Sequence, residues 1–156
     1  MSDVLDKWGQ PVAERGFAQV PNYLLLLNQF LDPERRLSSV ELLILIQLVG
    51  TWWKKTELPF PSMSTLATRC GVSDRQIQRA VNNLEKKGLI TKTRRRYESG
   101  LRATNAYDLQ PLIGILNQVA KAFPNEFPRN VSRDKVKEIS TSLAALSPAP
   151  FSADGE

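Results

Sequence analysis

The stretch from Ser62 to Ile90 constrains the fold more strongly than any other part of this 156-residue chain. Within it, apolar residues recur at positions i, i+3, i+4 and i+7, the spacing that gives an α-helix one buried face. These residues are Ile77, Ala80, Val81 and Leu84. Ser73 is a good N-cap and Gly88 is a good C′ residue. The pattern therefore predicts a helix over residues 73–87 with one face buried and the other exposed.

The exposed face of this predicted helix carries side chains that can read DNA bases. An α-helix advances about 100° per residue, which places a polar set opposite the apolar stripe or on its flanks. The set comprises Arg75, Gln76, Gln78, Arg79, Asn82, Asn83 and Lys86. In the major groove, Arg can bond guanine, and Asn or Gln can bond adenine, through two hydrogen bonds.

A second helix is predicted immediately before the first. The same spacing recurs behind Ser62 as N-cap, at Met63, Leu66, Ala67 and Cys70, and residues 71–73 leave room only for a tight turn. This order is helix, turn, helix. Hydroxyl side chains at the start of the earlier helix could contact DNA phosphates, although their ordinary role is capping. They are Ser62, Ser64 and Thr65.

A β-hairpin is predicted after the helix pair. Residues 89–93 and 106–109 can form its strands, and the loop between them is basic and contains Gly100. Its arginines are Arg94, Arg95, Arg96 and Arg102. A basic hairpin beside a recognition helix is a wing, which we expect to contact the DNA backbone.

The positive charge is concentrated in these elements. Residues 69–102 hold ten Lys or Arg and three acids, whereas the rest of the chain holds eleven and thirteen, within a net charge of +5. A charged run alone is usually only a solvated face. Its coincidence with a helix-turn-helix pattern favours a nucleic-acid partner.

The stretch resembles the winged helix-turn-helix superfamily, in the branch found in bacterial replication initiators, phage replisome organisers and accessory transcription regulators. The resemblance covers about residues 17–109 and is carried by Leu66-Ala67, Gly71-Val72-Ser73, Gln78-Arg79, Leu84-Glu85 and Gly88-Leu89-Ile90. It implies a mainly α fold with a small β-hairpin (α+β), a winged helix-turn-helix with extra N- and C-terminal helices.

The same resemblance implies a double-stranded DNA partner. In such complexes the N-terminal half of the recognition helix enters the groove most deeply, so Arg75, Gln76 and Arg79 should reach bases. Lys86 should reach at most phosphate, and Gln78 and Asn82 are intermediate. Transcription regulation and replication initiation both fit, and the lack of a large second domain favours regulation. A module that binds only protein is a third interpretation, which the concentrated charge opposes.

The residue counts exclude several kinds of site. With one cysteine and no histidine, zinc sites, disulfides and His-based catalysis are ruled out, and no Gly-rich phosphate loop is present. The acids of the basic region, Asp74, Glu85 and Glu98, fit a cap, an intrahelical pair and a wing residue. We therefore expect no enzyme activity and no cofactor. Cys70 fits a small core residue better than a redox sensor.

Three regions are predicted along the chain: a flexible arm (1–16), the winged helix-turn-helix domain (17–128), and a short helix with a disordered tail (129–156). Trp8 should anchor the arm against the domain, with insertion at DNA as the alternative. Residues 17–20 alternate like a third strand, and residues 23–31 form an apolar helical run. No signal peptide or membrane-length apolar run is seen, so a soluble cytoplasmic protein is expected.

Two apolar helices suggest a homodimer. Ser38 and Glu41 form a capping box before a helix over residues 40–53 that is apolar nearly all round. Such a helix needs cover from other elements, of which residues 23–31 are one candidate, or from a second protomer. Its last residues, Trp52 and Trp53, fit the core better than a stacking platform for single strands.

The C-terminal third adds two further apolar faces. The helix over residues 112–122 either packs on the domain or joins the dimer interface. Within residues 132–146, an apolar seam could fold on a protein partner, dock on the domain or stay disordered. The seam comprises Val136, Ile139, Leu143 and Leu146.

Overall fold

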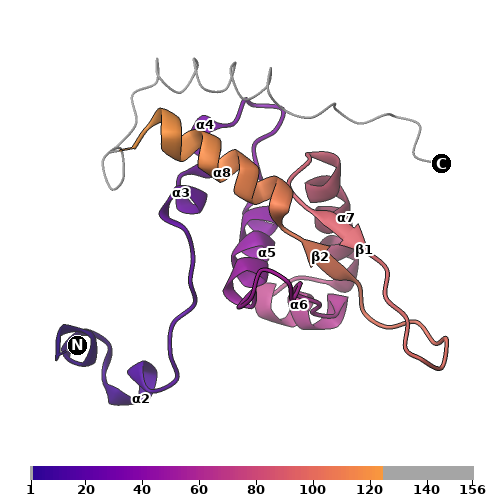
Figure 1. Cartoon of the computed structure of the whole chain (residues 1–156), viewed down its shortest axis with the longest axis horizontal. Coiled ribbons are helices and arrows are strands. Elements are labelled where there is room, and N and C mark those ends of the chain that lie inside the picture. Colours follow the sequence, from indigo (N-terminus) through magenta and orange to yellow (C-terminus); the bar gives the residue numbers. More distant parts are fainter. Residues whose placement is uncertain (1, 125–156) are drawn as a thin grey trace.

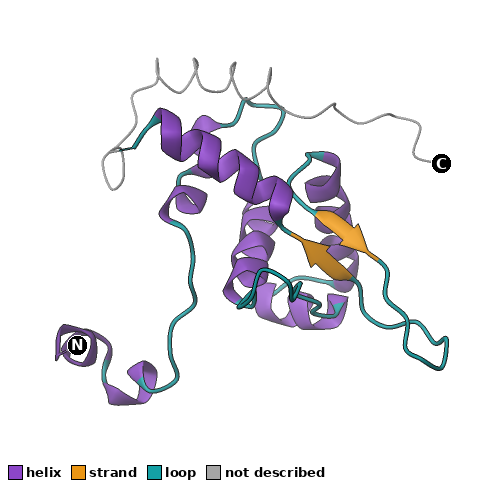
Figure 2. Ribbon diagram, viewed as in Figure 1, coloured by secondary structure: helices purple, strands orange, loops and turns teal. Residues whose placement is uncertain are grey.

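The computed structural model describes residues 2–124 of the chain (Figure 1). The predicted fold class is confirmed, because most elements are helices and the strands form a two-stranded antiparallel sheet (Figure 2). The predictions for residues 129–156, including the apolar seam of 132–146, lie outside the described residues.

The elements follow the sequence in the order that a winged helix-turn-helix requires. They are α1 (Ser2–Trp8), α2 (Gln10–Ala13), α3 (Asn22–Leu25), α4 (Leu27–Phe30), α5 (Ser39–Gly50), α6 (Met63–Cys70), α7 (Asp74–Lys86), β1 (Thr91–Thr93), β2 (Ala106–Asp108) and α8 (Gln110–Ala122). Helices α5, α6 and α7 form a three-helix unit, and the hairpin extends beyond it (Figure 1).

The core lies between α5, α6 and α7 and continues to α8. Fully buried side chains from all four helices belong to one cluster, including Ile44, Leu48, Leu66, Val81 and Leu112. Leu42 and Ile46, on the remaining faces of α5, are half-buried against the same cluster. Elements of the same chain therefore cover much of the apolar surface of α5. That surface is a weaker argument for a dimer than the sequence pattern suggests. The homodimer stays a prediction.

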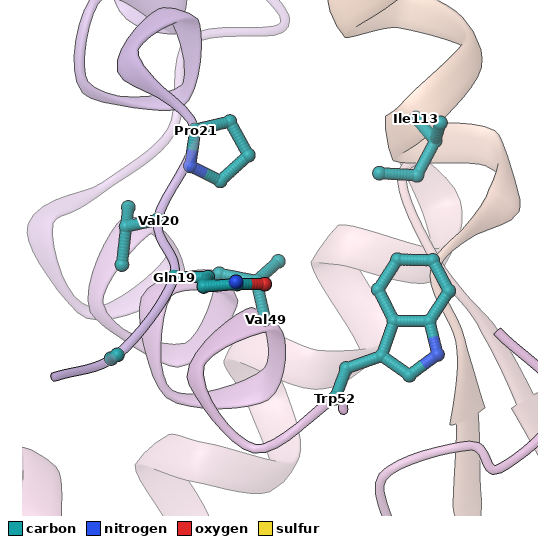
Figure 3. Close-up of a pocket in the computed structure, with 7 residues that line it drawn as sticks. Gln19, Val20, Pro21, Val49, Trp52 and Ile113 are labelled. Carbon is teal, nitrogen blue, oxygen red and sulfur yellow. The ribbon is translucent and has the colours of Figure 1, made fainter. Parts of the chain in front are cut away.

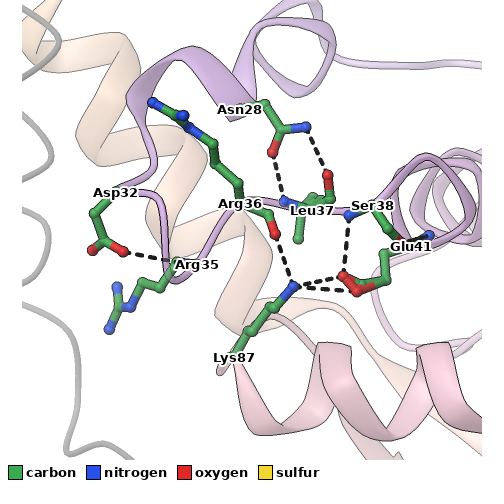
Figure 4. A network of polar contacts seen from close by, with 8 residues as sticks. All are labelled: Asn28, Asp32, Arg35, Arg36, Leu37, Ser38, Glu41 and Lys87. Atoms are coloured by element: carbon green, nitrogen blue, oxygen red, sulfur yellow. Dashed lines mark hydrogen bonds and ion pairs between the residues drawn. The ribbon is translucent and has the colours of Figure 1, made fainter.

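The N-terminus of α5 confirms the predicted capping box. The Ser38 side chain accepts a hydrogen bond from the Glu41 amide, and the Glu41 carboxylate accepts one from the Ser38 amide. Before it, Asn28 binds both the amide and the carbonyl of Leu37, at 2.7 and 3.0 Å (Figure 4). These bonds hold the turn that leads into α5.

The predicted end of this helix at residue 53 is wrong, because α5 ends at Gly50. The Thr51 hydroxyl donates back to the carbonyls of Gln47 and Leu48, and its amide also bonds the Leu48 carbonyl, so the last turn is capped there. Trp52 is half-buried against the core. Trp53 is 70% exposed, which corrects its assignment to the core.

The third strand predicted at residues 17–20 does not form. The Tyr107 amide of β2 instead donates to the carbonyl of Pro59, at 2.9 Å, so the segment before α6 occupies that edge of the hairpin. Pro59 and Pro61 have no amide hydrogen, which prevents a longer ladder. Residues 18–21 instead line a groove with Val49, Trp52 and Ile113 (Figure 3).

The apolar run 23–31 is helical as predicted, but it is broken at Leu26 into α3 and α4. The Tyr23 hydroxyl donates to the Phe123 carbonyl, and the rings of Phe30 and Phe123 lie 5.3 Å apart. Val119 is buried in the same small cluster. Of the two predicted roles for the apolar face of α8, packing on the domain is therefore the one observed.

The N-terminal arm forms the short helices α1 and α2, set apart from the other helices in Figure 1. Trp8 meets the ring of Phe17 edge-on at 6.0 Å and is 51% exposed. It belongs to neither core cluster of the described residues. Trp8 therefore contacts the first residue of the predicted domain and does not reach either core cluster.

Candidate nucleic-acid interface

The recognition helix α7 begins and ends at local signals. Gly71 adopts the left-handed conformation (φ 71°) that ends α6 and turns the chain. Ser73 and Gln76 then form a capping box at the start of α7. At its end, the amide of Leu89 donates to the Leu84 carbonyl across Gly88 (φ 73°). The predicted boundaries at Ser73 and Gly88 are confirmed.

The two faces of α7 divide as the sequence predicts. Ile77, Ala80, Val81 and Leu84 are buried. The polar side chains Arg75, Gln76, Gln78, Arg79 and Lys86 are exposed, and Asn82 is half-buried. The helix therefore presents a row of hydrogen-bonding side chains to solvent. Its opposite face is packed in the core and holds the helix in place.

Two members of this row already have partners. The Gln76 side-chain oxygen accepts a hydrogen bond from the Ser73 amide at 3.0 Å, and the Asn82 side-chain oxygen accepts one from Nζ of Lys92 at 3.2 Å. Base reading by either oxygen would require that bond to break. Arg75, Gln78 and Arg79 make no side-chain hydrogen bond or ion pair to other residues of 2–124.

Of the hydroxyl side chains at the start of α6, Ser62 caps the helix. The Ser62 hydroxyl accepts from the Thr65 amide at 3.0 Å and donates to the Thr65 hydroxyl at 2.9 Å. Ser64 is exposed. The capping role is therefore observed for Ser62, and phosphate contact by Ser62, Ser64 and Thr65 stays a prediction.

The wing is the hairpin that the sequence predicts. Strands β1 and β2 pair antiparallel, with Lys92 opposite Tyr107 and Thr93 opposite Ala106. Arg96 and Arg102 form a further bridge in the loop, and the tip projects away from the helices (Figure 1). This shape gives the arginines reach beyond the body of the domain.

The wing arginines are not equivalent. The Arg95 guanidinium lies 4.1 Å from the centre of the Phe60 ring and bonds the Thr104 hydroxyl, so it is held at the base of the wing. Arg96 bonds the Gly100 carbonyl at 3.1 Å. Arg94 and Arg102 are exposed. Arg94, Arg96 and Arg102 are the arginines best placed to meet phosphate.

Lys92 is a candidate contact that the sequence reasoning missed. Its amide donates to the Glu85 carboxylate at 2.8 Å, and its ammonium group reaches Asn82 on α7. Glu85 therefore caps a strand and does not form the predicted intrahelical pair. Successive side chains of a strand point to opposite faces, so Lys92 lies on the other face from Thr91 and Thr93. This alternation was the signal that the sequence offered.

The far end of α7 is tied to α5 by an ion pair. Nζ of Lys87 lies 2.5 Å from the Glu41 carboxylate and bonds the carbonyl of Arg36 at 2.9 Å (Figure 4). The sequence placed Lys87 at the helix end, where the dipole favours a cation. The pairing with Glu41 joins residues too distant in the chain for that rule to predict.

The single cysteine has the surroundings expected of a core residue. Cys70 is half-buried at the end of α6, beside the main cluster. Burial raises the pKa of its thiol, which disfavours the reactive thiolate. Within residues 2–124, no cluster of His, Cys, Asp or Glu could hold a metal ion, and no helix is long and apolar enough to cross a membrane.

This fold and site define a winged helix-turn-helix, and comparison with known families agrees. Residues 35–90, from the turn before α5 to the start of the hairpin, match a family described as a helix-turn-helix domain. No curated protein matches the chain. The chain therefore contains a helix-turn-helix DNA-binding domain, with the hairpin as its wing.

Proposed function

We propose that this protein binds double-stranded DNA at specific sequences and regulates transcription, with α7 in the major groove and the wing on the backbone. One observation carries the proposal. Arg75, Gln78 and Arg79 project from a helix whose opposite face is buried, and their side chains have no partner among the described residues. Unpaired donors on a rigid helix are suited to base edges.

The contacts divide by position along the interface. Arg75, Gln76 and Arg79 lie in the first half of α7 and are assigned to bases. Lys86 and the wing arginines are assigned to phosphate, which positions the protein without reading sequence. Lys92 lies between α7 and the wing and joins this phosphate-binding group. No catalytic residue or cofactor is assigned, and the proposed place of action is the cytoplasm.

Replication initiation is the second candidate. It is favoured by two exposed aromatic rings, Trp53 and Phe60, beside the interface, because initiators act where duplex DNA opens. Footprinting across the genomic neighbourhood of the protein distinguishes the two. Protection over a promoter supports regulation, whereas protection over iterated repeats supports replication. Absence of any protected site, with no selectivity in a randomised-sequence selection, would contradict both.

A further inference from the structure

The segment between α5 and α6 forms a second surface next to the predicted duplex interface. A groove of about 390 Å³ is lined by Thr51, Trp53 and residues 57–61 of this segment and by Thr65 and Arg69 of α6. Trp53 and Phe60, which are 70% and 56% exposed, both contribute to its walls. Single exposed apolar residues are common on protein surfaces, but two aromatic rings on one groove indicate a ligand with a flat apolar face.

Two arginines lie at this groove and its rings. Arg69 lines the groove, and the Arg95 guanidinium lies over the Phe60 ring at 4.1 Å. Lys54 and Lys55 are exposed on the same segment. The nearby acid is Glu57, which pairs with Lys54 at 3.6 Å. Two arginines at the aromatic rings, with two lysines exposed on the same segment, match a ligand that combines bases with phosphates.

The groove is continuous with the proposed DNA interface. Thr65 lines it and belongs to the first turn of α6, and Arg95 joins Phe60 to the base of the wing. A strand that leaves a duplex held by α7 and the wing could therefore reach the groove. Base pairs inside a duplex could not use it, because they are stacked on each other and expose only their edges in the grooves.

We infer that this groove binds an unpaired base of a single strand that continues from the bound duplex, by stacking on Trp53, with Phe60, whose ring carries Arg95 on one face, as an apolar wall beside it. The inference rests on the proposed DNA binding. It assigns Arg69, the arginine that lines the groove, to a phosphate next to that base. Stacking of a base on an aromatic ring tolerates any base, so this contact adds affinity without adding sequence preference.

The test compares two DNAs that carry the same selected site. One is a blunt duplex, and the other has a short thymine extension, placed on the 5′ end and the 3′ end in separate probes. Affinities of the full chain are measured by fluorescence anisotropy. The unsubstituted protein should bind one extended duplex at least about fivefold more tightly than the blunt one. Trp53→Ala should remove this gain and leave blunt-duplex affinity unchanged.

Two matched variants complete the experiment. Trp53→Phe keeps an aromatic ring and should retain most of the gain, and Trp8→Ala, which removes an exposed tryptophan outside the groove, should retain all of it. Equal affinity for blunt and extended duplexes would overturn the inference, as would a Trp53→Ala effect on both DNAs alike. Selective binding to the blunt duplex with no gain leaves the proposed function standing. Binding to neither DNA contradicts both.

Discussion

The ammonium group of Lys87 lies 2.5 Å from the carboxylate of Glu41, whose side chain is 3% exposed. The same carboxylate accepts a hydrogen bond from the Ser38 amide, at 3.2 Å. One buried group thus caps the start of α5 and pairs with the residue that follows α7. This ion pair therefore links the end of the recognition helix to α5, in addition to their buried apolar faces.

Replacing Lys87 with Met should destabilise the fold by about 2 kcal/mol or more, because it leaves Glu41 buried without its counter-ion. Urea denaturation measures the change in unfolding free energy. The double variant Glu41→Gln with Lys87→Met should recover part of that loss. If Lys87→Met alone leaves stability unchanged, the pair does not hold α7 in place.

Binding to duplex DNA should weaken steeply with salt. If roughly six phosphates are contacted, log affinity should fall against log salt with a slope near about −5. Replacing Arg94 and Arg96 together with Ala should make the slope shallower by about 2 and weaken specific and random DNA alike. A slope near zero would contradict binding through the backbone.

Arg95 is predicted to differ from its two neighbours. Because it stacks on Phe60 and bonds Thr104, Arg95→Ala should loosen the base of the wing as well as remove a charge. Thermal melting should show a loss of stability for Arg95→Ala, with Arg94→Ala as the matched control that melts like the unsubstituted protein. Equal melting temperatures would mean that the stacking contributes nothing.

Arg79→Ala should cost about 1 to 3 kcal/mol on the selected site and flatten base preference at one position. Lys86→Ala, the control nearly two turns further along α7, should lower affinity without changing preference. Glu85 bonds the Lys92 amide, and Arg79 makes no ion pair within residues 2–124, so stability should not fall. A destabilised Arg79→Ala with unchanged preference would show a structural role instead.

A homodimer should read two half-sites about one helical turn apart. Sedimentation of the full chain, with and without such DNA, measures its mass. A monomer at tens of micromolar under both conditions would contradict the dimer. Because the apolar faces of α5 and α8 pack within one chain, the dimer contact would be made by other surfaces, such as the N-terminal arm.

The recognition helix could be predicted from the sequence because its signals are local. Ser73, the apolar stripe and Gly88 lie within one segment, and each acts on its immediate neighbours. The end of α5 was misplaced because the apolar run continues to Trp53, while the cap at Thr51 depends on a hydroxyl group bonding back to the preceding turn. In the prediction, the long apolar run counted for more than the one hydroxyl group, of Thr51, that ends the helix.

Contacts between distant residues could not be predicted in the same way. Nothing in the spacing of residues indicates that Arg95 stacks on Phe60 or that Lys87 reaches Glu41. The strand expected at residues 17–20 had the correct alternation, but the edge of the hairpin is taken by Pro59. Such choices depend on which segments meet in three dimensions, so they required the structure.

Lys92 joins the first strand of the wing to α7 twice, through its amide to Glu85 and through its ammonium group to Asn82. The spacing between the reading helix and the start of the wing is therefore set before DNA arrives. A protein with a preset spacing compares groove dimensions as well as bases, since a duplex that must deform to fit both contacts binds less well. We expect its preferred sites to share a groove width at base pairs that no side chain touches.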